Sequence, residues 1–242
     1  MPTIEFSGHV FPHPAVQISA TGGPTEWNDA NLRFTYAFRI EKSIVTITCQ
    51  VEQITDVSLN YIHQIVAVRA RGVIDAIAFS RGTGLRLLID YCRLPDQKPR
   101  PLRSGDPALA TLCSITELEV IRLIEKEGRI LKPLNDLTET LSDPLDSFVN
   151  CQRAIEGIGR LMSDSEERKV RWEYLRNSLN LTRTYLDFVS ERSVPDRHGA
   201  TGPVSMRDVG EAQVRGWTTM NRFLEFRKRN SVRLSLSEFP LL

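Results

Sequence analysis

Residues 32–52 read LRFTYAFRIEKSIVTITCQVE, and apolar and polar side chains alternate along most of this stretch. A period of two residues is that of a β-strand with one buried face, and the many β-branched residues agree with it. Glu41 and Lys42 interrupt the alternation near its middle. The stretch therefore predicts a β-hairpin, in which two antiparallel strands are joined by a tight turn.

The segments on either side of this hairpin indicate a small β-rich module. Residues 21–29, TGGPTEWND, contain two glycines and a proline and are typical of a loop. Residues 58–80 place apolar side chains at helical spacing, although Gly72 weakens the pattern, and RGTG at 81–84 predicts the end of that helix. We expect four to six strands with one helix packed on them. The further strand candidates are residues 3–11, 15–20 and 85–92.

The second half of the chain has a helical period instead. Ser114 and Glu117 form an S-x-x-E capping box, and Ser205 with Asp208 predicts another helix start. The dipeptide Asp143-Pro144 combines a capping residue with a proline at the first helical position. Helices joined by short loops predict an antiparallel bundle of four or five members.

One long helix is expected over residues 166–192, and its apolar side chains recur every three or four positions. Pro195 lacks a backbone N–H and disfavours helical angles at the residue before it, so we expect the chain to turn there. The tail SVRLSLSEF, residues 231–239, alternates again and predicts an added strand or an arm. Together the patterns predict an α+β fold with a β-rich module at 1–112 and an antiparallel helical bundle at 113–242.

Composition and charge exclude several classes of protein. The formal net charge is +1, from 31 basic and 30 acidic residues, which is unlike a general nucleic-acid coat protein. No run approaches the roughly 20 apolar residues needed to cross a bilayer, and the amino terminus does not resemble a signal peptide. The four cysteines lack C-x-x-C spacing, so we expect reduced thiols in a cytoplasmic protein that has no membrane contact. His9 and His13 have no third partner of zinc-ligand type, so neither a metal nor another cofactor is expected.

The sequence SERSVPDRHGATG, residues 190–202, holds the candidate catalytic pair Arg192 and His198. On an unbroken helix, six positions amount to a rotation of about 600°, which separates the two side chains, whereas a turn at Pro195 brings them together. An imidazole passes protons near neutral pH, and a guanidinium holds a phosphate, so the pair suits metal-independent cleavage of RNA through its 2′-hydroxyl. The alternative is that Arg192 caps a helix end and His198 is an ordinary exposed loop residue.

This arginine and histidine, placed at the end of a helix in an all-α bundle, resemble the motif of the HEPN superfamily of small helical domains. The segments LRNSLNLTRTYLDFVSERSVPDRHG and GWTTMNRFLEFRKR also resemble the helical part of bacterial proteins that carry RHG at this place. The resemblance covers about residues 115–230 and implies an RNase or toxin of phage defence, with Arg192 binding phosphate, His198 acting as acid or base, and a homodimer completing the site. Ser193 departs from the Asn, Asp or His that the superfamily prefers, and the proline inside the motif is also unusual. Some members of the superfamily serve only as binding or dimerisation modules.

Nucleic-acid contacts are expected at Arg197 and at Arg227, Lys228 and Arg229, within the basic segment EFRKRNSVR. The alternative for that segment is a solvated helix end. Residues 115–242 contain 16 arginines, which suit phosphate contacts and equally suit paired networks on helical surfaces. Trp172 lies at helical spacing from other aromatic residues and is either a core residue or a platform for a base.

Two functional hypotheses follow. The first is a bacterial HEPN-like protein of phage defence or stress response that cuts RNA without a metal. The second is a non-catalytic binding or scaffold protein, in which the β-rich module recognises a protein partner and the helical bundle dimerises.

Overall fold

The computed structural model describes the chain except for residues 13–16, 29–31, 103–106, 143–145 and 198–204. It divides into two compact units, Met1–Ser104 and Gly105–Leu242, here called the sheet unit and the helical unit. The expected α+β fold is confirmed, because the first unit holds an antiparallel sheet with one helix and the second is helical. The division precedes residue 112, since the short helix α2 (Pro107–Ala110) packs on α8 (Met206–Lys228) of the helical unit.

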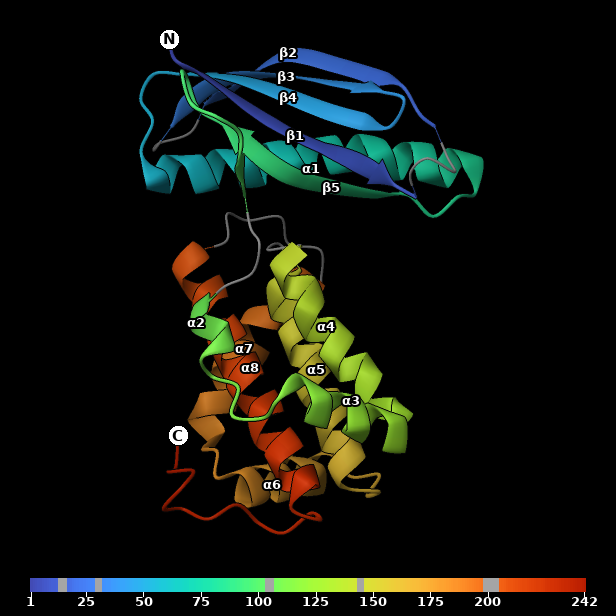
Figure 1. Cartoon of the computed structure of the whole chain (residues 1–242), viewed down its shortest axis with the longest axis vertical. Helices are drawn as coiled ribbons and strands as arrows, with labels where there is room; N and C mark the ends of the chain where they lie inside the picture. Colours follow the sequence, from blue (N-terminus) through green and yellow to red (C-terminus); the bar gives the residue numbers. More distant parts are fainter. Residues whose placement is uncertain (13–16, 29–31, 103–106, 143–145, 198–204) are drawn as a thin grey trace. The chain divides into compact units, whose positions relative to one another are not determined.

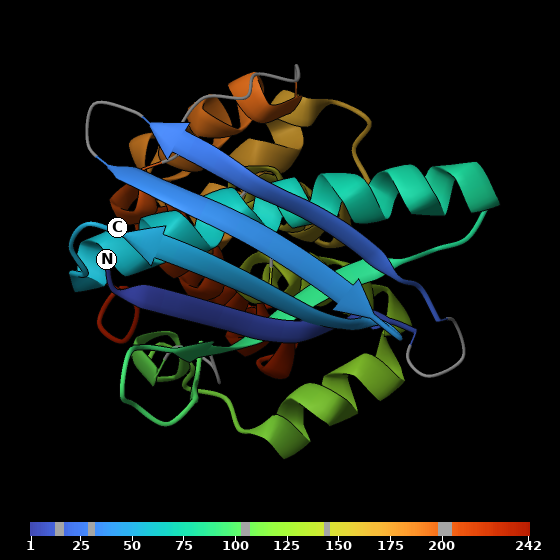
Figure 2. The same cartoon turned by 90° about the horizontal axis from the view of Figure 1, so that it is seen from above.

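The sheet unit contains six antiparallel strands in the order β2-β3-β4-β1-β5-β6 (Figure 1). The expectation of four to six strands with one helix is therefore confirmed. Figure 2 looks onto the face of the sheet that the helix does not cover. The strands are β1 (Thr3–Phe11), β2 (Ala20–Asn28), β3 (Arg33–Glu41), β4 (Ile44–Val51), β5 (Arg86–Arg93) and β6 (Arg100–Pro101).

The single helix of the sheet unit, α1 (Asp56–Arg81), covers the other face of the sheet and closes its core. Inward side chains of neighbouring strands are in register, so that Phe6 lies opposite both Ile47 and Cys92. The helix ends as the RGTG sequence predicts, because Gly82 adopts a left-handed conformation with φ 61° and Thr83 N–H donates to the carbonyl of Ala78. The side chains of α1 that meet the sheet are Leu59, Ile62, Val66, Ala70 and Ile74.

The hairpin expected from residues 32–52 is formed by β3 and β4, in which Glu41 pairs with Ile44. The two residues between them, Lys42 and Ser43, have φ of 50° and 67°. A two-residue loop with both residues left-handed matches the twist of antiparallel strands.

One expectation for this unit is wrong, because residues 21–29 are not a loop but largely the strand β2. Its position at the edge of the sheet accommodates Pro24, whose missing N–H would break the ladder of a central strand. The register shifts between Gly22 and Thr25, and Gly22 lies so close to the ring of Phe38 that a Cβ there would be 2.2 Å from Cε1. Of the strand candidate at 15–20, only Ala20 is in a strand, and residues 15 and 16 lie outside the described part.

The helical unit is built around α5, which packs against α4, α6, α7 and α8. The apolar stripes expected in the second half form its core, with Leu175, Leu186 and Phe223 all buried. The tail after α8 forms turns, and Leu234 inserts into the core, so the tail is an arm and not a strand. The helices besides α2 and α8 are α3 (Glu117–Lys126), α4 (Leu131–Ser142), α5 (Ser147–Met162), α6 (Arg168–Leu179), α7 (Arg183–Arg197) and the 3-10 turn η1 (Gly128–Ile130).

One of the expected helix starts differs from the structure, and another lies outside the described residues. Thr116 and Glu119, not Ser114 and Glu117, form the capping box of α3, because Ser114 instead bonds to side chains of α8. The helix α5 begins at Ser147, and the expected start at 143–144 lies outside the described residues. The expected cap of α8 is confirmed, since the Ser205 side chain accepts from Asp208 N–H.

The expected break at Pro195 is wrong, because α7 continues through it to Arg197. Proline has a φ compatible with helix, and its cost arises from one lost hydrogen bond and the contact of its ring with the preceding turn. Pro195 is exposed and only two residues of α7 follow it, so the carbonyl left without a partner is near the helix end.

A methyl group at Gly8 tests the packing of β1 on β5. An ideal Cβ at this position lies 1.9 Å from the carbonyl oxygen of Leu88 and 2.7 Å from Cα of Ile89, so Gly8→Ala must push the strands apart. We expect a loss of about 3 kcal/mol of unfolding free energy, at the upper end for overpacking. Gly72→Ala is the matched control, since nothing lies within 4 Å of its Cβ and the helix gains about 0.5–1 kcal/mol. Urea titration, followed by Trp27 fluorescence in a chain with Trp172 and Trp217 replaced by Phe, measures the unfolding free energy of both variants. Equal unfolding free energies for the two variants would contradict the close packing of β1 on β5 at Gly8.

The capping box of α3 stabilises the fold to an extent that depends on pH. Hydrogen bonds from Thr116 N–H, from the Lys228 ammonium and from the Thr116 hydroxyl lower the pKa of Glu119 from 4.5 to about 2. Because the folded pKa is the lower one, this stabilisation is complete above pH 4.5 and is lost as the pH falls towards 2. We expect NMR titration to find Glu119 ionised at pH 3.5 and Thr116→Ala to raise its pKa. A Glu119 pKa of 4.5 in the unchanged chain would show that the box does not form.

Candidate functional site

The candidate catalytic arginine, Arg192, lies on α7 and faces α8. Its Nε donates to Oδ2 of Asp208 at 3.2 Å, and its guanidinium lies 3.7 Å from the centre of the Phe188 ring. The side chain is about one third exposed, at 36%. His198 and the side chain of Arg197 lie outside the described residues. Arg192 is thus held by a carboxylate at the start of the next helix.

The basic segment at the end of α8 is neutralised by neighbouring carboxylates. Arg227 contacts Glu127 at 3.3 Å and donates to the Leu161 carbonyl at 2.6 Å. Lys228 pairs with Glu119 at 3.0 Å, and Arg229 pairs with Glu225 at 3.4 Å and Glu238 at 2.7 Å. These three cations therefore tie α3 and the tail to α8.

The long helix expected over residues 166–192 is two helices, α6 and α7, because the chain reverses at Asn180. Asn180 ends α6 in a left-handed conformation with φ 52° and ψ 52°, which asparagine tolerates better than most residues. Two residues later, the Thr182 hydroxyl accepts from Tyr185 N–H and caps the start of α7. The repeat of apolar residues continues across the break, so periodicity alone does not reveal it.

Buried hydrogen bonds fix this reversal to the end of the chain. The Asn180 amide donates to the carbonyls of Leu234 and Phe239 at 2.9 and 3.0 Å. Arg222 of α8, only 5% exposed, donates to the carbonyls of Leu179, Asn180 and Pro240 at 2.7–2.8 Å. Burial lowers the pKa of Arg222, but an arginine stays charged at neutral pH. The dipoles of these three carbonyls therefore stabilise the buried positive charge.

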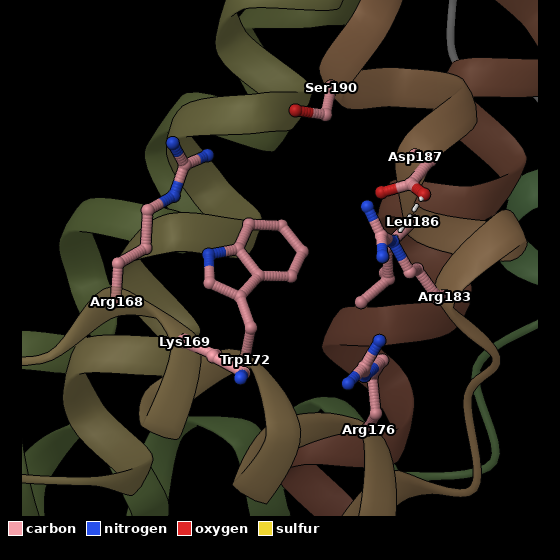
Figure 3. Close-up of a pocket in the computed structure, with 8 residues that line it drawn as sticks. All are labelled: Arg168, Lys169, Trp172, Arg176, Arg183, Leu186, Asp187 and Ser190. Carbon is pink, nitrogen blue, oxygen red and sulfur yellow. Dashed lines mark hydrogen bonds and ion pairs between the residues drawn. The ribbon is translucent and has the colours of Figure 1, made fainter.

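The reversal places one face of α6 opposite one face of α7, and a pocket of about 360 Å³ lies between them, here called the cationic cleft (Figure 3). Helical spacing explains which residues line this pocket, because residues three, four or seven positions apart lie on the same face of a helix. Figure 3 shows the indole of Trp172 between the Arg168 side chain and the side chains of α7. The lining residues are Arg168, Lys169, Trp172 and Arg176 of α6 and Arg183, Leu186, Asp187 and Ser190 of α7.

The four cations of the cationic cleft differ in their partners. Arg168 contacts Glu156 at 3.1 Å, and Arg183 contacts Asp187 at 3.1 Å. Lys169 and Arg176 form no ion pair or side-chain hydrogen bond with any residue that the structure describes. This distinguishes them from Arg215, Arg222 and Arg227 of α8, whose guanidinium groups bond to carbonyls or carboxylates of the helical unit.

A second pocket of about 230 Å³ adjoins the first, and Arg168 and Trp172 line both. Its other lining residues are Glu156, Gly159, Arg160 and Arg171. Arg171 donates to the carbonyls of Ser165 and Glu166, whereas Arg160 is exposed and has no ion pair within the described part of the chain. The two pockets together present six cations and two carboxylates around one indole.

Such an arrangement binds phosphate groups and a flat aromatic ring. Guanidinium and ammonium groups bind phosphate, and the face of an indole stacks on bases. Burial raises the pKa of all four cysteine thiols, to about 12 for Cys49 and Cys151, which disfavours the reactive thiolate. In the described ranges, no group of three or more His, Cys, Asp or Glu side chains is placed to hold a metal ion, and no helix is long and apolar enough to span a bilayer.

The sequence contained part of the signal for this site. Trp172 stood out as a possible platform, and the arginine content of the second half suited phosphate contacts. The pairing of α6 with α7 was missed because the break at Asn180 carries no glycine or proline. Once N-x-T at 180–182 is interpreted as the end of one helix and the cap of the next, the facing stripes follow from helical spacing.

Two family models match the chain. Residues 4–102 match "Domain of unknown function (DUF8168) N-terminal domain" and residues 115–228 match "Domain of unknown function (DUF8168) C-terminal domain". No curated protein and no solved structure gives a significant match. The first match falls in the sheet unit and the second in the helical unit. The chain therefore contains both domains of the DUF8168 family, one in each structural unit.

Proposed function

We propose that the helical unit binds RNA through the cationic cleft. The observation that carries this proposal is a pair of cations with no ion-pair partner in the described part of the chain, Lys169 and Arg176, beside the half-exposed indole of Trp172. The cations that stabilise this fold have partners: Arg227 and Arg229 pair with carboxylates, and Arg222 bonds to carbonyls. Unpaired cations that line a concave surface with an aromatic ring are typical of sites that bind nucleic acid.

The local charge supports the same proposal. Residues 115–242 contain 20 basic and 20 acidic residues, so the unit as a whole has no excess of positive charge. The two pockets around Trp172 nevertheless hold six cations and two carboxylates, a formal excess of four positive charges. Like charges so close together repel one another, and a polyphosphate ligand relieves that repulsion while releasing its own counterions.

A second candidate function is cleavage of the bound RNA by Arg192 and His198, as the resemblance to HEPN domains implies. The exposure of Arg192 supports it, because its guanidinium is partly exposed and is oriented by Asp208 and Phe188 near the end of α7, although the turn at Pro195 that was expected to bring the two side chains together is absent. His198 follows directly after the last residue of that helix in the sequence. In this role Arg192 binds the phosphate and His198 transfers the proton.

Loss of the two unpartnered cations is expected to weaken RNA binding. For the full chain with Lys169→Ala and Arg176→Ala, the Kd for a fluorescent RNA oligonucleotide should rise about tenfold or more at 0.1 M salt, since two phosphate contacts are removed. The slope of log K against log salt should fall in magnitude by about 0.7 for each cation removed. Fluorescence anisotropy over a salt series measures both quantities.

The matched control removes an arginine and a lysine from elsewhere in the helical unit. Arg122 of α3 and Lys132 of α4 are exposed, and neither has an ion pair with a described residue. The variant with Arg122→Ala and Lys132→Ala has the same net charge as the cleft variant and should bind RNA as the unchanged chain does. Equal weakening in both variants, or no RNA binding by the unchanged chain, would remove the proposed site.

The cleavage candidate is tested with the same RNA in the presence of EDTA. We expect the unchanged chain to cut it and His198→Ala or Arg192→Ala to reduce the rate about 100-fold or more, as is typical when a proton-transfer or charge-stabilising group is lost. Replacing the ribose 2′-hydroxyl at the cut position should abolish cleavage. Equal rates for all proteins, or no cleavage by any, would leave RNA binding without catalysis.

A further inference from the structure

We infer that the ligand of the cationic cleft is a single strand, which crosses Trp172 from the pocket between α6 and α7 into the adjoining pocket beside α5, with one base stacked on the indole. This inference rests on the proposed function and adds to it the form of the RNA and its path. It depends on three features of the described residues: the shared wall of the two pockets, the distribution of cations on both sides, and the exposure of the ring.

The first feature is that Trp172 and Arg168 line both pockets. A ligand that contacts the indole therefore has a recess on each side of it, of about 360 and 230 Å³. Recesses of this size take groups comparable to a nucleotide or smaller. A duplex is a stiff rod whose bases are stacked inside it, so it cannot enter either recess without unpairing.

The second feature is that both pockets lined by Trp172 contain cations. Lys169, Arg176 and Arg183 line the first pocket, and Arg160 and Arg171 line the second. A backbone that continues over the indole therefore meets positive charge before and after the stacked base. This alternation of cation, aromatic ring and cation is how single-strand binding surfaces track a phosphate backbone without reading its sequence.

The third feature is that the indole is only partly buried. Trp172 packs against the core of the helical unit, and the Arg168 guanidinium lies over its ring at 5.6 Å from the ring centre. Arg168 is held by Glu156, whose Oε1 also accepts from Gln152. The Glu156 carboxylate competes with a phosphate for Arg168 and repels the backbone, so it limits affinity in the second pocket.

The experiment uses the full chain with Trp27→Phe and Trp217→Phe, so that Trp172 is the single fluorescent reporter. This protein is titrated with oligouridylates of two and eight nucleotides. It is also titrated with a short RNA duplex that has as many phosphates as the octamer. We expect the octamer to quench Trp172 and to bind at least tenfold more tightly than both the dinucleotide and the duplex. Trp172→Leu, measured by anisotropy, should weaken the octamer about tenfold or more, whereas Trp172→Phe should keep most of the affinity.

Two further variants test the path. Arg160→Ala should weaken the octamer and leave the dinucleotide unchanged, because only the longer strand reaches the second pocket. Glu156→Gln keeps the acceptor for Gln152 and should strengthen the octamer a few-fold by removing the competing charge. The control Arg122→Ala should change neither.

The outcomes separate this inference from the proposed function. If RNA binds and Lys169→Ala with Arg176→Ala weakens it, but the duplex binds as tightly as the octamer or Trp172 fluorescence does not change, the single-strand path is overturned while the site stands. An Arg160→Ala variant that binds the octamer unchanged would also overturn the path. If the unchanged chain binds no RNA at all, the proposed function is wrong, and the single-strand path that rests on it is wrong as well.

Discussion

The reversal of the chain at Asn180 is the constraint on which the surface of the helical unit depends. A left-handed residue there costs about 1 kcal/mol, and the buried guanidinium of Arg222 offsets it by bonding the carbonyls of Leu179, Asn180 and Pro240. The same bonds anchor the tail. Without the reversal, α6 and α7 would be one helix, and the residues that line the cationic cleft would lie along one face of it instead of facing one another across a pocket.

The arginines of the helical unit fall into two groups with different physical roles. Arg222 and Arg227 hold the bundle through carbonyls and carboxylates, and the cost of removing them from water is offset by those bonds. Arg160 and Arg176 have no such partners among the described residues, so no ion pair of theirs stabilises the fold. Pairing, and not arginine content, therefore distinguishes a surface that is available to a ligand.

The helix α7 contributes residues to both candidate sites, the cationic cleft and the surroundings of Arg192, and these residues lie on different faces of the helix. Arg183, Asp187 and Ser190 face α6 and line the cationic cleft, whereas Phe188 and Arg192 face α8, where Asp208 holds the guanidinium. RNA binding in the cleft and cleavage beside Arg192 are thus separable by mutation, which is why the two proposals have separate tests. The continuation of α7 through Pro195 keeps Arg192 inside a regular helix.

The sequence by itself determined the elements whose residues specify them locally: the 32–52 hairpin, the helix closed at Gly82, the Ser205 cap and the division into a β-rich and a helical half. Tertiary structure decided the rest, because the deciding partners are distant in sequence. The strand β2 tolerates Pro24 only at a sheet edge, and the left-handed Asn180 is stabilised by bonds with Arg222 and the tail. The cationic cleft has the same origin: helical spacing sets each stripe, but only packing brings the two stripes face to face.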